Sequence, residues 1–406
     1  MGFLSDAINK MDKKGLMKDN LPLIGYPTQL YPLDYRNGYA VLVHDKNGKV
    51  VERWANTGIF GGTIVIVAGK PGTAKTAYCI QAAAEICRPY KNAEFHLFDI
   101  EGSSNISRVI DLIDYDFDEV KDKFEYHDEI QYIEDMFDFI VNMAKIKLDN
   151  RDQFAAKFDR KDEFGRVREA LVPTVIIIDS QPMLMTKDLE GMEGLAGQTY
   201  DMRKARALSQ FYRRLRPVIK KANITVMIIN HVNFKAEINP FAKSQAQIMY
   251  MKQDEAMPGG NAPMYLAQTL LKFVSCGKYS ADKDGFDGFA IRAELIKSKT
   301  NKAGTSCVIV YDAHYGFDKY RTIYEMLKDG GYIEGRNPYL YIKNFPEIKF
   351  SSKNFRDECI NNPELFRLAV KVMAPTLYSY LGSSDDLDSY TESPEESAAR
   401  MNAPEK

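Results

Sequence analysis

The stretch Gly61–Thr76, GGTIVIVAGKPGTAKT, decides the fold of this chain. Its first part, Thr63–Ala68, is a run of β-branched and small apolar residues, which is typical of a strand buried on both faces. A glycine-rich turn follows, and after Lys75-Thr76 an alanine-rich sequence up to Cys87 predicts a helix. A strand, such a turn and a helix aim backbone N–H groups and the helix N-terminus at one point, which favours a bound phosphate.

This turn predicts a nucleotide-binding site. Lys75 would reach the β- and γ-phosphates of ATP, and the hydroxyl of Thr76 would ligate Mg²⁺. Ala74 stands where the second glycine of the motif usually occurs, so the sequence departs from the motif there. The alternative is an ordinary strand–turn–helix unit in which Lys-Thr follows the turn by chance. The residues expected around the phosphates are Gly69, Lys70, Pro71, Gly72, Thr73, Ala74, Lys75 and Thr76.

Composition describes a globular chain without a global charge bias. Its 406 residues are 45% hydrophobic and 27% charged, which is enough to bury a sizeable core. The net charge of −2 means that any binding of nucleic acid would arise from local geometry. No apolar run reaches membrane-spanning length, and the first residues lack a secretory hydrophobic region. Five scattered cysteines without metal-ligand spacing predict reduced thiols in a cytoplasm.

Acidic residues follow two further predicted core strands. Glu94–Asp99 runs into a loop that contains Glu101, and the apolar run after Pro173 ends in Asp179. The carboxyl ends of parallel strands meet at the edge of the sheet where α/β proteins build their sites. We therefore expect Glu101 to orient and deprotonate the water that attacks the γ-phosphate, and Asp179 to hold Mg²⁺ with Thr76. Each carboxylate alone would more often be a loop residue or a helix cap.

Later segments suggest a nucleic-acid partner. Tyr132–Ile146 has helical periodicity, whereas residues 147–170 mix both charges and are expected to be a solvated helix or an insertion without chemistry. Asp201–Lys221 is a basic amphipathic helix, which is usually a solvated face but could contact a phosphate backbone. The linker 232–262 interleaves aromatic and basic residues, a composition that suits single-stranded nucleic acid because rings stack on bases and lysines meet phosphates.

The remaining pattern completes an α/β chain. Residues 1–20 resemble a short amphipathic helix, and the Ser-, Asp- and Glu-rich residues 382–406 predict a disordered acidic tail. The other expected elements are a hairpin at 39–54, strands at 224–230, 269–275, 289–296 and 307–311, and helices at 352–361 and 363–380.

In this order, the motifs resemble those of the RecA recombinases, most closely the UvsX-type recombinases of tailed bacteriophages. The similarity covers about residues 20–380, and its specific points are Asp179-Ser180, Asp201-Met202-Arg203, Ile229-Asn230-His231 and Gly259-Gly260-x-x-Pro263-Met264-Tyr265. The resemblance implies an α/β fold: a RecA-like P-loop ATPase core with a mostly parallel central sheet, a small N-terminal segment and an α-helical C-terminal region. The implied parts are a subunit-docking segment 1–35, the core 36–325, a small C-terminal region 326–381 and the tail 382–406.

The resemblance also implies roles for residues that the motif analysis leaves open. Besides the lysine of the phosphate turn and Glu101, the catalytic residues would include Lys297 and Lys299, which would reach ATP of the adjacent subunit. From sequence alone these two would be exposed lysines at a strand end. Asn230 and His231 would sense the γ-phosphate. Arg108 stands where many relatives stack a tyrosine on adenine, and a guanidinium can also stack on a base.

Two loops, at about 185–200 and 232–260, match the DNA-binding loops of the family. The DNA-binding residues that the resemblance implies are Lys187, Arg203, Phe234, Lys235, Phe241, Lys243, Gly259 and Gly260.

The implied function is that of an ATP-dependent DNA recombinase that forms filaments on single-stranded DNA and catalyses homologous pairing and strand exchange, using ATP and Mg²⁺. Its partners would be single-stranded DNA, homologous duplex DNA, further copies of itself, a recombination mediator and a single-stranded-DNA-binding protein, without a membrane. Its location would be the cytoplasm, that of the host if a phage encodes the chain. The alternatives are a ring-forming RecA-fold DNA motor, such as a replicative helicase, and an ATP-binding switch whose hydrolysis DNA does not stimulate.

Overall fold

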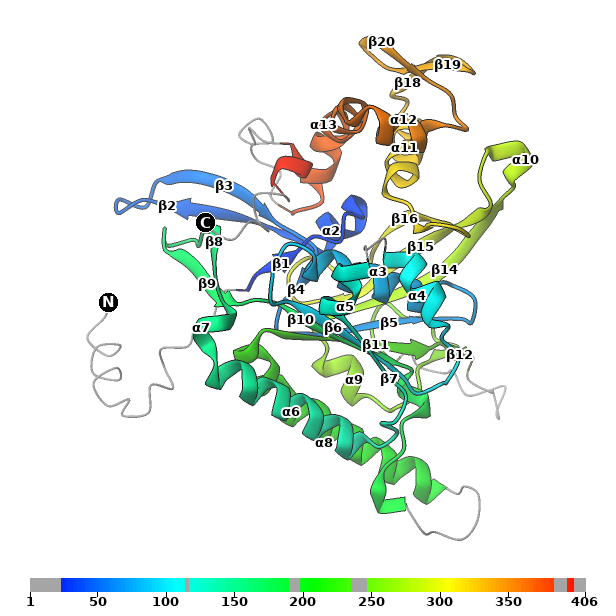
Figure 1. The fold of residues 1–406 in the computed structure, drawn as a ribbon. Coiled ribbons are helices and arrows are strands. Elements are labelled where there is room, and N and C mark those ends of the chain that lie inside the picture. The colour runs from blue at the N-terminus through cyan, green and yellow to red at the C-terminus, as the bar shows by residue number, and fades with distance from the viewer. Residues whose placement is uncertain (1–22, 114–116, 190–197, 235–246, 383–392, 398–406) are drawn as a thin grey trace.

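A nine-stranded sheet with helices on both faces forms the centre of the molecule (Figure 1). The computed structural model describes residues 23–113, 117–189, 198–234, 247–382 and 393–397. The strand order is β17-β16-β15-β14-β5-β11-β10-β6-β7. The chain therefore has the predicted α/β fold.

Six neighbouring strands of this sheet are parallel, and three antiparallel strands extend it on one side. The parallel arrangement brings the ends of β5, β6, β10 and β11 to one edge, as the sequence predicts. The parallel strands are β14 (Thr269–Tyr279), β5 (Ile64–Gly69), β11 (Ile224–His231), β10 (Thr174–Asp179), β6 (Glu94–Asp99) and β7 (Phe124–His127). The antiparallel strands are β15 (Gly288–Ser298), β16 (Thr305–Asp312) and β17 (Gly316–Phe317).

The apolar run of β5 is buried on both faces because two helical layers cover the sheet. Val65 and Val67 pack under α3 (Lys75–Cys87) and α4 (Ile106–Ile113). Ile64 and Ile66 face the other layer, which contains α6 (Ile133–Asp149) and α8 (Gln198–Ala222). Since successive side chains of a strand point to opposite faces, a continuous apolar run is what a two-sided core requires.

Residues 147–170 differ most from expectation. Only their first part is helical, in the end of α6 and in α7 (Arg151–Phe154). The rest is an antiparallel hairpin of β8 (Ala155–Lys161) and β9 (Val167–Leu171), so the helical interpretation is wrong there. The hairpin packs on a second hairpin, β2 (Tyr39–His44) and β3 (Val50–Asn56), which the Asn-Gly turn predicts correctly. The two hairpins are joined by an Arg160–Glu52 ion pair of 3.1 Å and by Trp54 Nε1, which donates to the Lys161 carbonyl.

The C-terminal part has its own apolar core and contains a small sheet besides the predicted helices. Asp318 caps a further helix, α11 (Lys319–Asp329), by accepting hydrogen bonds from the backbone N–H groups of Tyr320 and Arg321. Residues 393–397, within the expected tail, include a helical turn in which Ser397 is buried. The elements are α11 (Lys319–Asp329), β18 (Ile333–Arg336), β19 (Tyr339–Ile342), β20 (Phe345–Phe350), α12 (Phe355–Asn361) and α13 (Pro363–Ser379).

Shorter elements connect these parts. None of the helices in the described ranges is long and apolar enough to cross a membrane. The connecting elements are β1 (Gly25–Tyr26), α2 (Tyr31–Asn37), β4 (Ile59–Phe60), α5 (Phe117–Lys123), η1 (Gln181–Met183), η2 (Lys187–Leu189), β12 (Asn233–Phe234), β13 (Glu255–Ala256), α9 (Ala262–Leu266) and α10 (Ala281–Asp284).

Candidate functional site

The turn between β5 and α3, which we call the phosphate loop (Gly69–Thr76), has the backbone that its sequence predicts. Gly72 has a φ of +74°, and nothing lies within 4 Å of the position that a Cβ would occupy. Ala74 also lies in the left-handed region, at φ 55° and ψ 30°, which costs a residue with a side chain roughly 1–2 kcal/mol. This explains why glycine is usual there, while a small residue is still accommodated.

Lys75 is held inside this loop. Its side chain is 6% exposed, and its Nζ donates a hydrogen bond of 2.9 Å to the carbonyl of Lys70. Thr73 Oγ1 donates to the same carbonyl at 2.8 Å. Burial lowers the pKa of Lys75, whereas the carboxylates of Asp179 and Glu101 raise it. The lysine therefore lies within electrostatic reach of both predicted acidic residues, at one edge of the sheet.

Thr76 and Asp179 are brought together from α3 and β10. Thr76 Oγ1 donates a hydrogen bond of 2.6 Å to Asp179 Oδ2. Burial is the main cause that raises the pKa of Asp179, the hydrogen bond from Thr76 and the charge of Lys75 lower it, and the carboxylates of Glu101 and Asp99 raise it; the resulting pKa is about 6. A hydroxyl beside a carboxylate is the oxygen donor set that Mg²⁺ takes together with phosphate oxygens and water. These residues fit a magnesium–nucleotide site.

Glu101 lies beside this pair and contacts two neighbouring strands. Its Oε1 accepts a hydrogen bond from Ser180 Oγ, and the same oxygen lies 3.2 Å from His231 Nε2. The backbone N–H of Glu101 donates to the carbonyl of Asp179 at 3.2 Å, which anchors the loop after β6 to the end of β10. The carboxylate is thus fixed in position while its side chain stays partly exposed to solvent.

Asp99 has a different, supporting position. It is 2% exposed and accepts hydrogen bonds from the backbone N–H groups of Ser103 and Ser104 and from the hydroxyl of Tyr126. These bonds fold the loop that carries Glu101 back onto β6. Asp99 therefore supports the position of the loop that carries Glu101.

The end of β11 is tied to the glycine-rich segment near residue 259. Asn230 Nδ2 donates to the carbonyl of Pro258 at 3.2 Å, and Gln181 Nε2 donates to the same carbonyl at 3.1 Å. Gly259 has a φ of +96°, and a Cβ there would lie 2.0 Å from Gln181 Nε2. Sequence reasoning missed Gln181, although its place directly after the Asp179-Ser180 pair was the available signal.

The described DNA-binding candidates have different surroundings. Phe234 is 60% exposed, and the Nζ of Lys70 lies 4.6 Å from the centre of its ring, so the phosphate loop touches the start of the second predicted DNA loop. Lys187 Nζ forms a 2.5 Å ion pair with Asp135, and Arg203 donates to the carbonyl of Asp188 at 3.4 Å. Gly259 and Gly260 have positive φ, whereas Lys235, Phe241 and Lys243 lie outside the described residues.

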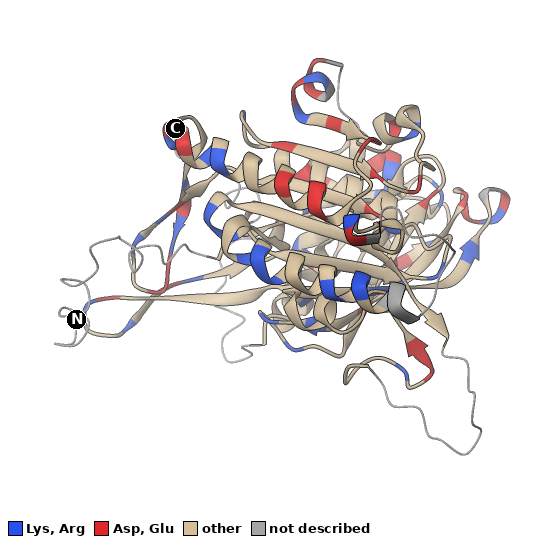
Figure 2. Cartoon of the chain, turned by 90° about the horizontal axis from the view of Figure 1, so that it is seen from below, with Lys and Arg blue, Asp and Glu red and all other residues tan. Residues whose placement is uncertain are grey.

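Basic residues along α8 form the main cationic surface near these candidates. Figure 2 views the molecule from below, where α6 and α8 face the viewer, and shows the Lys and Arg of α8 beside the Asp and Glu of α6. Arg214 is one member, stacked 4.6 Å from the ring centre of Phe137 on α6. The predicted basic amphipathic helix is confirmed, with its apolar side buried against the sheet.

Lys297 and Lys299 lie at the opposite edge of the sheet. Ser298 pairs with Thr269, the first residue of β14, whereas Phe273 further along β14 pairs with Gly69 at the phosphate loop. Lys297 Nζ donates to the carbonyls of Met264 and Tyr265 at 2.6 Å each. Burial, together with the like charges of Lys299 and Arg216, lowers the pKa of Lys297 to about 8. Within one chain these lysines are therefore separated from the phosphate loop by the length of the strands.

Arg108 is anchored to the turn between β16 and β17. Its guanidinium donates to the carbonyls of His314 and Ala313 at 3.0 and 2.7 Å, and to the hydroxyl of Tyr311 at 3.3 Å. These bonds hold α4 against the antiparallel part of the sheet. A contact of Arg108 with adenine stays a prediction.

The sequence resembles several RecA proteins at low identity. It is 24% identical over 164 residues to protein RecA of Aquifex aeolicus, which is 38% of this chain and 42% of that protein. The identity is 26% over 193 residues to protein RecA of Caulobacter vibrioides (47% and 49%) and 26% over 179 residues to that of Geobacter sulfurreducens (42% and 47%). The chain spans less than half the length of these curated relatives in the matches. No protein-family model matches it.

Proposed function

We propose that this protein is an ATP-dependent DNA recombinase of the RecA kind, which assembles on single-stranded DNA and promotes homologous pairing and strand exchange. The observation that carries the proposal is the convergence of Lys75, Thr76, Glu101, Asp179 and His231 at one edge of a parallel sheet. The similarity to RecA proteins supports it. A UvsX-type origin in a tailed bacteriophage is part of the same proposal.

ATP hydrolysis follows from the roles that the site allows. The phosphate loop holds the triphosphate through backbone N–H groups and Lys75, and Thr76 with Asp179 holds Mg²⁺, which neutralises charge on the phosphates. Glu101 accepts a proton from the attacking water, because its carboxylate is fixed by Ser180 and His231 but partly exposed. Since phosphoryl transfer depends mainly on positioning and electrostatics, this set is sufficient on one side of the nucleotide.

The residues that contact the other side of the nucleotide are proposed to come from a second copy of the chain. Lys297 and Lys299 cannot serve the phosphate loop of their own chain, because they lie at the opposite edge of the sheet. In a filament, that edge would face the phosphate loop of the next copy, where the two charges would stabilise the transition state. A nucleotide between copies would thus join assembly to hydrolysis.

DNA binding is proposed for the loops that begin beside the site. His231 is followed along the chain by Phe234, and Asn230 contacts the carbonyl of Pro258, so both ends of the second loop meet residues near Glu101. Loss of the γ-phosphate would change the contacts of His231 and, through them, the conformation of this loop. Homologous duplex DNA, a mediator and a single-stranded-DNA-binding protein complete the proposed partners.

The test is ATP hydrolysis measured with and without single-stranded DNA, with negative-stain microscopy of the same samples. The proposal predicts hydrolysis that DNA stimulates, together with open helical filaments that exchange strands. Closed rings of fixed size with directional duplex unwinding would contradict it, as would hydrolysis that DNA leaves unchanged.

A further inference from the structure

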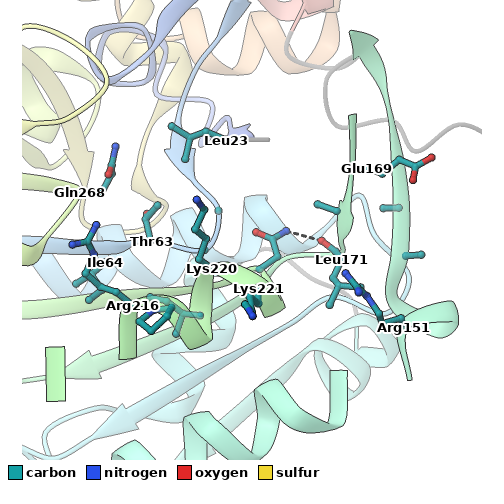
Figure 3. A pocket seen from close by; sticks show the side chains of 18 of the residues that line it. Leu23, Thr63, Ile64, Arg151, Glu169, Leu171, Arg216, Lys220, Lys221 and Gln268 are labelled. Atoms are coloured by element: carbon teal, nitrogen blue, oxygen red, sulfur yellow. Dashed lines mark hydrogen bonds between the residues drawn. The ribbon is translucent and has the colours of Figure 1, made fainter. Parts of the chain in front are cut away.

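A pocket of about 880 Å³ lies at the edge of the sheet opposite the phosphate loop (Figure 3). Its floor is formed by residues at the starts of three parallel strands. They are Thr63 and Ile64 at the start of β5, Leu171 shortly before β10 and Asn223 directly before β11. Asn223 Nδ2 donates to the carbonyl of Leu171 at 2.6 Å and to the hydroxyl of Tyr26 at 2.7 Å. The floor is therefore fixed by hydrogen bonds between the strand starts.

Two walls of different origin enclose this floor. One is the C-terminal end of α8, and the other is α7 with the β8–β9 hairpin, the inserted segment whose mixed charges indicate no chemistry of their own. Figure 3 shows Arg151 beside Leu171 and the side chains of Arg216, Lys220 and Lys221 on α8.

The charge that lines this pocket is strongly unbalanced. Lys157 forms a 3.6 Å ion pair with Glu169, so these two charges offset each other. The other acidic lining residue is Asp152. The side chains of five further cations, all exposed, make no hydrogen bond or ion pair with any residue that the structure describes. They are Arg151, Arg213, Arg216, Lys220 and Lys221.

The spacing of these cations suits an extended anion. Arg213, Arg216 and Lys220 follow one another at three and four residues on α8, so they share a face and span roughly 10 Å along the axis. Cations gathered in a concave site reinforce one another's field and attract multiply charged ligands. Arginine guanidinium groups also match the oxygens of phosphate in two-point hydrogen bonds. A single carboxylate would leave most of this charge uncompensated.

We propose that this pocket is a second phosphate-binding site, in which Arg151 on one wall and Lys220 and Lys221 on the other contact the phosphate groups of a nucleotide or of a nucleic-acid backbone. None of the lining residues is aromatic, so the pocket recognises phosphates rather than bases. A bound phosphate would bridge the β8–β9 hairpin and α8, which gives the inserted segment a role. This inference does not depend on the proposed recombinase function.

The first experiment measures binding of inorganic triphosphate to the Lys75→Ala variant by isothermal titration calorimetry. This substitution lowers the affinity of the phosphate loop for triphosphate, so that binding at the second site can be measured. We expect residual binding that the added changes Lys220→Gln and Lys221→Gln weaken about tenfold or more, because each removes a charged hydrogen-bond donor. Arg151→Gln tests the other wall and should weaken binding in the same direction. The matched control is Lys46→Gln with Lys49→Gln, two exposed lysines in and after the β2–β3 turn, which should bind like the parent.

The second experiment identifies the source of the phosphate. Single-stranded oligonucleotide and ATP are each used to displace a fluorescent triphosphate analogue from the Lys75→Ala protein. Displacement by the oligonucleotide at lower concentration assigns the pocket to a nucleic-acid backbone, and displacement by ATP assigns it to a free nucleotide. Circular dichroism and the thermal midpoint confirm that each variant is folded.

The proposal is overturned if the glutamine variants bind triphosphate as tightly as the Lys75→Ala parent. It is also overturned if triphosphate does not bind to the Lys75→Ala protein at all.

Discussion

Glu101 Oε1 lies 3.2 Å from His231 Nε2 and accepts a hydrogen bond from Ser180 Oγ. One carboxylate oxygen thus joins the loop after β6 to the ends of β10 and β11. If Glu101 contacts the nucleotide as proposed, a movement of its carboxylate would change the contact with His231 and so reach the end of β11. The chain beyond His231 leads directly into the second predicted DNA loop.

Removing each partner of this contact should therefore have a different effect. Glu101→Gln should lower ATP hydrolysis by about 10²–10⁴-fold with or without DNA, because it removes the proposed general base. His231→Ala leaves that base in place, so DNA-free hydrolysis should fall much less than the stimulation by single-stranded DNA. Steady-state hydrolysis at saturating ATP distinguishes the two. Equal losses with and without DNA in His231→Ala would argue against a sensor role.

The raised pKa of Asp179 predicts how magnesium binding responds to pH. With a pKa of about 6, the carboxylate is mostly ionised at pH 7 and mostly protonated at pH 5. The apparent affinity for Mg²⁺ with ATP should therefore fall by roughly tenfold per pH unit below 6, since a metal ligand must be deprotonated. Calorimetric titration of Mg²⁺ between pH 5 and 8 measures this slope. Asp179→Asn should bind weakly at every pH and lose the slope.

The same shift sets the sign of a stability effect. A carboxyl whose pKa is raised in the folded state stabilises the fold at low pH, and this contribution is lost as the pH rises through about 6. Asparagine does not ionise, so the Asp179→Asn variant does not lose stability as the pH rises. The thermal midpoint of this variant at pH 7.5 should therefore equal or exceed that of the parent protein. A lower midpoint would show that the ionised carboxylate supports the fold.

Mixing two inactive proteins tests the role of Lys297 and Lys299 between copies. Lys75→Ala should abolish ATP turnover while the fold stays intact, and the double variant Lys297→Ala, Lys299→Ala should lose turnover in the assembled state. In an equal mixture, about one quarter of random contacts would pair an intact phosphate loop with intact lysines, so part of the activity should return. A mixture as inactive as its components would contradict a contribution from the neighbouring copy.

Lys147 provides a prediction that is independent of function. It is 2% exposed, its Nζ donates to the carbonyl of Val172 at 2.9 Å and to Thr174 Oγ1 at 2.8 Å, and burial lowers its pKa to about 7. The unfolded chain binds this proton more tightly, so the lysine costs stability below about pH 7, and the fold becomes more stable as the pH rises from there towards 10.

Lys147→Met should remove this pH dependence, which is on the order of a few kcal/mol. Denaturant unfolding at pH 6, 7.5 and 9 measures the free energy of unfolding. Lys145→Met, an exposed neighbour on the same helix, is the matched control and should keep the dependence.

The sequence predicted the parts of the fold that local pattern controls. The β-branched runs of β5, β10 and β11 are confirmed because a strand covered on both faces requires apolar residues throughout. The residues of the phosphate loop, Glu101 and Asp179 could be placed at one edge because parallel strands end together.

What the sequence could not show depends on distant partners. In the β8–β9 hairpin the buried face includes Arg160, whose partner Glu52 is 108 residues away along the chain. A charged residue at a buried position hides the alternation that signals a strand, so the segment resembled a solvated helix. Gln181 was missed for a similar reason, since its contact with Pro258 exists only after folding.

If the phosphate loop and Lys297 act on one nucleotide as proposed, their opposite positions restrict how copies can associate. A two-fold symmetric dimer pairs one patch with itself and so cannot bring these two half-sites together. A heterologous, head-to-tail contact can bring them together. An open array built from such contacts then has one unmatched phosphate loop at one end and one unmatched pair of lysines at the other. Such an array has a direction, its two ends differ chemically, and hydrolysis per copy should increase with its length.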